Sequence, residues 1–318
     1  MRSGGEVVRG MGKQVKLFLA DGTPGELVTA EITNWTGHVV AAPRSKLAAL
    51  LEREEARRTG AYLLLGDDPD AVSGVRCYIG EGDEIRTRLK EHAGARGKDF
   101  WTRVVIITSK DANLTKAHGR HLESRLVSMA TAAARCTRDN GTAPPPSGLP
   151  EADVSDMDYF LQQLQIVLPV LGVNILRGRD AAAPESPSGL AVVEQSASPE
   201  FTLKVKRHGI DAHAQQIDGE FTVLAGSLAS AAFSESKSHA DSTAAAYAGY
   251  AKLHSKLRED GSLRPQGALL EFTRDVVFAS ASASAAGAIV TGRSCNGRTS
   301  WKTADGVTFG DWEQRGVK

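Results

Sequence analysis

Between residues 61 and 129, short apolar runs alternate with segments whose apolar residues have helical spacing. Three runs have the length and composition of buried strands: Ala61–Leu65, Val75–Ile79 and Trp101–Thr108. Two segments have the spacing of helices that bury one face: Ile85–Leu89 and Leu114–Met129. The order strand, strand, helix, strand, helix predicts an α/β (α+β) fold in which the first two strands form a hairpin.

Two segments rich in proline and small residues divide the chain. Residues 143–150 carry four prolines, which fix φ and lack the backbone donor, so they predict a stiff connector. An apolar stripe after it predicts a helix capped by Ser155. Residues 177–200 predict a flexible linker. The expected parts are an N-terminal β/α segment (1–58), a domain with a trailing helix (59–176), the linker (177–200) and a C-terminal region (201–318).

The C-terminal region is expected to be a small α+β domain. Four segments predict strands: Phe201–Val205, Phe221–Leu224, Phe272–Phe278 and Arg298–Lys302. Residues Ala244–Leu257 predict a helix.

The composition excludes several classes of protein. Lys+Arg and Asp+Glu both number 38, so the net charge is zero and the chain does not resemble a protein that coats nucleic acid. The three cysteines form no Cys-x-x-Cys pair, which is typical of reduced thiols. No apolar run approaches the roughly 18 residues that a membrane span needs, and residues 1–12 are polar. We therefore expect a cytoplasmic protein with no membrane partner.

Positive charge is concentrated in one stretch of this neutral chain. Residues 86–125 contain ten Lys or Arg and four Asp or Glu, an excess of six positive charges. A local basic patch of this kind is expected of a surface that contacts phosphates.

The same stretch carries polar residues in a recognisable order: Gly60-Ala61-Tyr62, Cys77-Tyr78-Ile79-Gly80, Arg88 and His92 four residues apart, and Glu123. This set resembles the GIY-YIG nuclease family. The resemblance implies a small domain with a three-stranded antiparallel sheet flanked by helices. Ala61 in place of isoleucine and a longer loop between the motif halves are departures from the family pattern.

The resemblance also implies an activity, the hydrolysis of phosphodiester bonds in DNA by a divalent-metal-dependent endonuclease. Glu123 matches the metal ligand, here for Mg²⁺ or Mn²⁺ completed by water and phosphate oxygens. Arg88 would hold a phosphate oxygen. Tyr78 is our first choice for the base that deprotonates water, with Tyr62 and His92 positioning it or relaying the proton. Further residues are expected to contact nucleic acid: Lys90, Lys116 and Asn140.

Other interpretations stay open at this stage. The chain could be a catalytically silent nucleic-acid-binding or protein-interaction module, and it could act with a protein partner in a bacterial restriction, defence or repair system. Together with Cys136 and Glu123, His118 and His121 could suggest zinc. No second Cys/His pair has the spacing of a structural site, so we expect surface or substrate-facing histidines.

The C-terminal region carries a second resemblance. Its residues 272–278, 280–288, 292–297, 301–302 and 305–306 are similar to a domain catalogued as DUF4357. Arg293, Arg298 and Trp301 could bind nucleic acid, with Trp301 stacking on a base. The alternative is that Trp301 lies in the core and the arginines are solvated.

Overall fold

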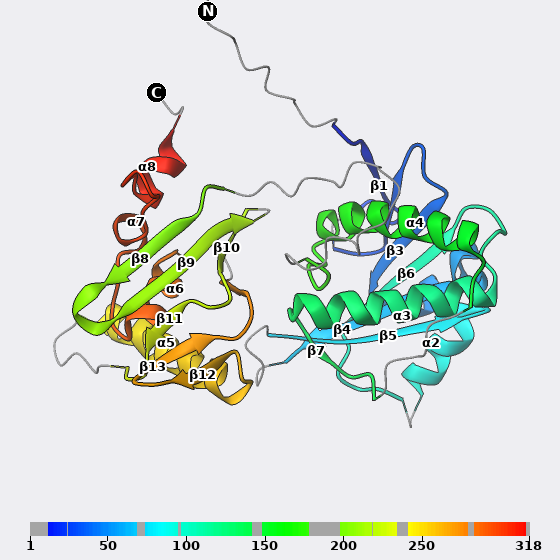
Figure 1. Cartoon of the computed structure of the whole chain (residues 1–318). Helices are drawn as coiled ribbons and strands as arrows, with labels where there is room; N and C mark the ends of the chain where they lie inside the picture. The colour runs from blue at the N-terminus through cyan, green and yellow to red at the C-terminus, as the bar shows by residue number, and fades with distance from the viewer. Residues whose placement is uncertain are drawn as a thin grey trace, which may run out of the picture. The chain divides into compact units, whose positions relative to one another are not determined.

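We analysed a computed structural model of the chain. It describes residues 12–23, 25–68, 74–94, 97–141, 148–177, 198–217, 219–233, 241–278 and 283–315, and for residues 241–248 the backbone alone. The chain divides into two compact units, residues 1–181 and 182–318, which are described separately below (Figure 1). Most of the expected linker 177–200 lies outside the described residues.

The N-terminal unit is built on one seven-stranded sheet. Its strands are β1 (Val15–Leu19), β2 (Val28–Ile32), β3 (Gly37–Pro43), β4 (Gly60–Asp67), β5 (Val75–Gly82), β6 (Arg103–Ser109) and β7 (Thr137–Arg138). The spatial order is β1-β2-β3-β6-β4-β5-β7. All pairs are antiparallel except β5 with β7.

This sheet is larger than the three-stranded sheet expected from the sequence. Strands β6, β4 and β5 form an antiparallel ladder, with the β4–β5 hairpin that the apolar runs predicted. The difference arises at β3, which pairs with β6 over seven residues from Gly37 to Pro43. Residues 1–58 therefore contribute β1, β2 and β3 to the same sheet.

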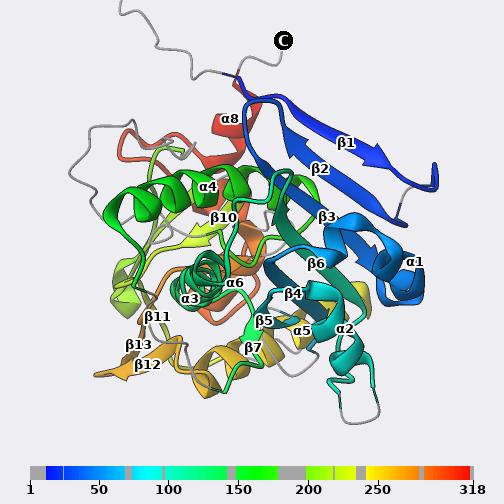
Figure 2. The same cartoon turned by 90° about the vertical axis from the view of Figure 1, so that its right-hand side faces the viewer.

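Helices cover both faces of the sheet, as Figure 2 shows. One face carries α3 (Lys116–Ala133) and α4 (Glu151–Val170). The other carries α1 (Leu47–Glu52), α2 (Ile85–Ala93) and the 3-10 turn η2 (Glu54–Arg57). A first 3-10 turn, η1 (Arg44–Lys46), comes directly before α1.

The two helical layers explain the unbroken apolar pattern of β4. Successive side chains of a strand point to opposite faces, so a strand covered on both sides is apolar throughout. Ala61, Leu63 and Leu65 pack in the core under α3 and α4. Tyr62 and Leu64 pack in the core under α1 and α2.

The sequence signals at helix ends were only partly interpreted correctly. Helix α3 begins after Thr115, whose side chain forms a capping box with His118. Helix α4 begins after Pro150, so Ser155 lies inside it and does not cap it as expected. Pro150 is the N-cap residue, and proline is tolerated there because the first amides of a helix have no acceptor within it.

The C-terminal unit contains two smaller sheets. The first has the order β14-β10-β9-β8 and the second β11-β13-β12. The strands are β8 (Phe201–Val205), β9 (Ile210–Ile217), β10 (Glu220–Val223), β11 (Leu228–Ser230), β12 (Leu263–Gln266), β13 (Leu269–Phe272) and β14 (Val276–Phe278). The helices are α5 (Asp241–Glu259), α6 (Ala283–Thr291), α7 (Gly297–Ser300) and α8 (Phe309–Gln314), and a 3-10 turn η4 spans Lys206–His208.

Two of the strand predictions for this unit were wrong. Residues 272–278 do not form one strand, because β13 ends at Phe272 and β14 of the other sheet begins at Val276. Residues 298–302 are not a strand, because the Asn296 side chain accepts a hydrogen bond from the Arg298 amide and starts the helix α7.

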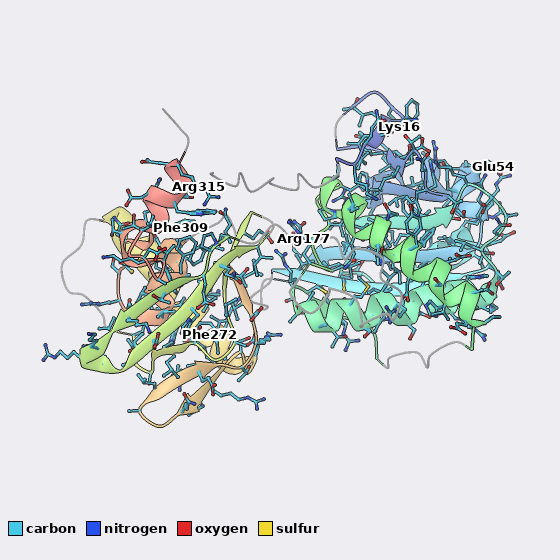
Figure 3. The ribbon with its side chains drawn as sticks, turned by 45° about the horizontal axis from the view of Figure 1, so that its top comes forward. Lys16, Glu54, Arg177, Phe272, Phe309 and Arg315 are labelled. Carbon is cyan, nitrogen blue, oxygen red and sulfur yellow. The ribbon has the colours of Figure 1, made fainter. Side chains whose placement is uncertain are left out.

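Aromatic rings form the core of the C-terminal unit around Phe309, which Figure 3 labels. Its ring centroid lies 5.2 Å from that of Phe201 and 5.0 Å from that of Phe221. The ring centroids of Trp301 and Phe221 lie 5.3 Å apart. Such edge-to-face contacts add to the free energy gained by burial.

None of the helices in the described part of the chain is both long and apolar enough to cross a lipid bilayer.

Candidate active site

Two glycines of β5 leave space for two of the expected site residues. Tyr62 on β4 lies opposite Gly80, and a Cβ at position 80 would lie 2.4 Å from the Tyr62 hydroxyl oxygen. A Cβ at position 82 would lie 2.9 Å from Cγ of Arg88. The second motif half therefore has glycine at position 80 because the tyrosine of the first half occupies that space.

Tyr62, Tyr78 and His92 form a compact cluster under α2. The Tyr62 hydroxyl and Nε2 of His92 share a hydrogen bond of 2.8 Å. Ring centroids lie 4.9 Å apart for Tyr78 and His92 and 6.2 Å apart for the two tyrosines. The Lys98 ammonium lies 4.3 Å from the centre of the Tyr78 ring. Three of the five expected catalytic residues are thus in mutual contact.

The electrostatics of this cluster favour neutral side chains. Burial raises the pKa of Tyr62, and the neighbouring Tyr78 adds to that effect while Arg88 opposes it. Burial also lowers the pKa of His92, assisted by the positive charges of Arg88 and Lys98. The hydrogen bond between Tyr62 and His92 therefore joins a neutral phenol to a neutral imidazole at pH 7.

Glu123 lies on α3, which covers the opposite face of the sheet from the tyrosines. Burial raises the pKa of Glu123, the Glu81 carboxylate raises it further, and Arg88 and Arg120 oppose the shift. Arg88 thus acts electrostatically on both Glu123 and Tyr62, from a position beside Gly82 at the end of β5.

Glu81 is a further candidate site residue, which the sequence analysis missed. It lies on β5 over Gly119 of α3, where an added Cβ would be 3.6 Å from its Oε2 atom. That oxygen is buried and has no hydrogen-bond partner among the described residues. The alternation of β5 could have identified it, since Cys77, Ile79 and Glu81 point to the same face as α3.

The carboxylates of Glu123 and Glu81 repel each other, and a divalent cation between them would remove this repulsion. No group of three or more His, Cys, Asp or Glu in the described ranges could hold a metal ion. Mg²⁺ typically keeps several waters and takes only one or two protein carboxylates, with phosphate oxygens completing the octahedron. Glu123 and Glu81 fit that donor set, and a cation would relieve their repulsion.

His118 and His121 do not form a metal site. His118 bonds to Thr115 through Nδ1, at 2.8 Å from the hydroxyl oxygen. His121 is buried, and burial lowers its pKa.

Asn140 has a structural position at the edge of the sheet. Its Nδ2 donates to the Ile79 carbonyl at 2.7 Å, and its Oδ1 accepts from the Ile79 amide at 3.1 Å. The preceding Asp139 pairs with Arg76 and Lys98. The side-chain amide of Asn140 is thus hydrogen-bonded to the backbone of β5. The sequence analysis had expected this side chain to contact nucleic acid.

Most basic side chains of residues 86–125 are paired with acids. Lys116 contacts Asp83 at 2.8 Å. Other pairs join Arg86 to Glu84, Arg88 to Glu91, Lys98 to Asp139, Lys110 to Glu31 and Arg125 to Asp158. Lys90 and Arg120 are exposed. The excess of positive charge counted along the sequence is therefore partly neutralised by acids from elsewhere in the fold.

Comparison with known proteins bears on the C-terminal unit. Residues 201–313 match the family described as "Domain of unknown function (DUF4357)". This segment is a DUF4357 domain. No curated protein and no solved structure matches the chain significantly. The comparisons give no support for a GIY-YIG domain, so that resemblance stays a prediction.

The DUF4357 domain begins at β8 and includes α8. Trp301 is fully buried in it, and its indole N–H donates to the Ala283 carbonyl at 3.0 Å. Trp301 therefore offers no face on which a base could stack. Arg298 contacts Glu313 at 3.3 Å, and Arg293 is exposed. The alternative interpretation of Trp301 as a core residue agrees with this geometry.

Proposed function

We propose that the N-terminal unit is a divalent-metal-dependent endonuclease that hydrolyses phosphodiester bonds in DNA, and that it has the GIY-YIG arrangement of catalytic groups. The observation that carries this proposal is the cluster in which the Tyr62 hydroxyl shares a hydrogen bond of 2.8 Å with His92 and the rings of Tyr78 and His92 lie 4.9 Å apart. Arg88 lies close to this cluster, beside Gly82 on the strand that carries Tyr78. The bacterial restriction, defence or repair role remains part of the proposal.

The residues suit the demands of phosphodiester hydrolysis. That reaction needs stabilisation of charge on the phosphate and an activated water. Glu123, with Glu81 beside it, would hold Mg²⁺ or Mn²⁺, which when bound acts as a Lewis acid and lowers the pKa of water. Arg88 would donate to a non-bridging phosphate oxygen through its planar guanidinium.

The two tyrosines have different environments and so different roles. Tyr62 is fully buried and its raised pKa keeps it protonated, so it orients His92 and does not itself contact solvent. Tyr78 is half-buried and lies beside Lys98. Tyr78 is therefore the group that would accept a proton from the attacking water, with His92 next to it.

The test is nicking of supercoiled plasmid DNA with Mg²⁺, comparing the wild type with Glu123→Ala. We expect cleavage by the wild type and at least about a 100-fold loss in the variant, the scale of removing one charge-stabilising group. Glu52→Ala is the matched control, because Glu52 has an exposed carboxylate in the same unit. Equal cleavage by Glu123→Ala and the wild type would contradict the proposal.

Salt-dependent DNA binding without cleavage under Mg²⁺ or Mn²⁺ would instead favour a catalytically silent binding module. The pairing of Arg88 with Glu91 is the observation that favours this second candidate, because the guanidinium that would hold the reacting phosphate already has an acidic partner.

A further inference from the structure

Two cysteines from distant parts of the chain meet at the edge of the N-terminal sheet. Cys77 lies on β5, and Cys136 lies just before β7, which pairs with β5. Their Sγ atoms are 2.9 Å apart, and both thiols are free. The proposed nuclease chemistry uses neither of them.

The backbone around this pair is fixed by several contacts. Arg76 and Cys77 pair in parallel with Thr137 and Arg138. The amide of Asp139 donates to the Cys77 carbonyl at 2.7 Å. Asn140 then holds Ile79 through two hydrogen bonds. A disulfide bond is about 2.05 Å long, so the sulfurs need to approach by only about 0.9 Å from their separation of 2.9 Å.

The two thiols differ in access and in charge. Cys77 is fully buried, whereas Cys136 is partly exposed. The hydrogen bond with Cys77 lowers the pKa of Cys136, and the positive charge of Arg138 lowers it further while burial opposes the shift. The same hydrogen bond raises the pKa of Cys77, as does its burial. Since the thiolate is the nucleophile, Cys136 is the thiol that attacks first.

We propose that Cys77 and Cys136 form a redox-active dithiol that reacts with a low-molecular-weight disulfide, such as oxidised glutathione, and closes into an intramolecular disulfide. The Cys136 thiolate attacks one sulfur of the small disulfide, forms a mixed disulfide and releases one thiolate. Cys77 gives its proton to that thiolate and attacks Sγ of Cys136, which expels the second thiolate to take a proton from solvent. The small disulfide is reduced to two thiols, and the protein dithiol is oxidised by two electrons.

The reaction would fix β7 covalently to β5. The segment that follows β7 carries Asp139, which pairs with Lys98 beside Tyr78. Oxidation would thus join the edge of the sheet to the strand that carries the candidate base. This inference stands on the contact between the thiols and does not depend on the proposed nuclease activity.

The test is incubation of the full-length protein with oxidised glutathione, followed by intact mass and peptide mapping. A Cys295→Ser background removes the third thiol. We expect the loss of two hydrogen atoms, no retained glutathione, and one cross-linked peptide pair containing Cys77 and Cys136. We also expect reversal by a reducing agent and a higher unfolding temperature for the oxidised form, because a cross-link restricts the unfolded chain.

Single variants in the same background separate the roles of the two thiols. Cys77→Ser should trap glutathione on Cys136, whereas Cys136→Ser should leave Cys77 unmodified until the protein unfolds. Circular dichroism confirms folding, and Cys77→Ala replaces Cys77→Ser if the hydroxyl is not tolerated. Two outcomes would overturn the proposal: stable glutathione on the two-cysteine protein without a cross-link, or no reaction of its thiols in the folded state.

Discussion

At the scale of single residues, burial controls the charge of the candidate site. Tyr62 of β4 and His92 of α2 share a hydrogen bond between the sheet and the helix, and burial is the largest cause of the pKa shift of each. Arg88 and Lys98 add positive charge at the margin of the cluster. The result is a hydrogen-bonded pair of neutral side chains with positive charge at its margin.

The lowered pKa of His92 makes stability depend on pH. The unfolded chain binds more protons than the folded chain below the ordinary histidine pKa of about 6.5, so the stabilising contribution of the neutral imidazole is complete above that pH and is lost on acidification. We expect His92→Gln to reduce the fall in unfolding temperature between about pH 8 and pH 5. Thermal unfolding checks this, with His208→Gln as the exposed-histidine control. An unchanged pH dependence in His92→Gln would be inconsistent with this role.

The charged form of Glu123 should lower the stability of the folded protein when no metal is bound. Its carboxylate is disfavoured by burial and by Glu81, so its pKa is raised and the charged form costs free energy at pH 7. Glu123→Gln should therefore raise the unfolding temperature in a chelating buffer, and Mg²⁺ should stabilise the wild type more than the variant. Calorimetry measures both effects, with Glu52→Gln as control. A lower unfolding temperature for Glu123→Gln would argue against strain between the carboxylates.

At the scale of elements, β5 organises both faces of the N-terminal sheet. Its even positions carry Tyr78 and the glycines that leave space for Tyr62 and Arg88. Its odd positions carry Cys77, Ile79 and Glu81, which face α3 or pack in the core beneath it. One strand therefore contributes to the tyrosine cluster, the carboxylate pair and the cysteine pair.

Filling the space at Gly80 should damage the site directly. In Gly80→Ala the new Cβ would lie 2.4 Å from the Tyr62 hydroxyl oxygen, so the Tyr62 ring or the β5 backbone must shift. Overpacking of this kind costs about 1–3 kcal/mol. Urea unfolding gives the loss of stability, and the control is Gly141→Ala, where nothing lies within 4 Å of the new group. Equal stability of the two variants would show that the close approach of a Cβ at position 80 to the Tyr62 hydroxyl does not lower stability.

Several elements could be predicted from the sequence because local pattern determines them. Strand β8 begins and ends at the expected residues, since it is a short run in which apolar and polar residues alternate. Strands β2 and β3 were missed, because the pairing of β3 with β6, which joins them to the sheet, is a long-range property that a short run does not reveal.

The candidate site was predictable to the extent that motif residues lie on regular elements. The contact of Tyr62 with His92 follows from the β4–β5 hairpin and from the helix α2 after it, whose last turn carries His92. The missed features depend on partners distant in sequence. Glu81 needed the face of β5 to be assigned, Trp301 needed the packing of α6, and the basic stretch needed its acidic partners to be known.

At the scale of the whole molecule, the chain consists of two units with separate cores. The N-terminal core has two layers, one on each face of the seven-stranded sheet. The aromatic cluster of the DUF4357 domain is built from residues of that domain alone. A separate core is the property that lets a domain fold as its own cooperative unit.

Removing the centre of the aromatic cluster should therefore affect one unit. Phe309→Ala deletes a buried ring that contacts Phe201 and Phe221, and truncation of a buried aromatic costs about 3–5 kcal/mol. We expect faster amide exchange throughout residues 201–313 and unchanged exchange in the strands β3, β4 and β6. Hydrogen exchange with mass spectrometry measures both regions. Equally faster exchange in both units would mean that they unfold together.

The missing side chain at position 80 has a consequence for the evolution of this chain. An aromatic hydroxyl at position 62 and any substituent at position 80 compete for the same volume, so each constrains what mutation can introduce at the other. Lineages that acquire a methyl group or more at position 80 should be those that have already exchanged the phenol at 62 for something shorter. The order of the two changes, and not only their joint occurrence, should be visible in a reconstructed ancestry.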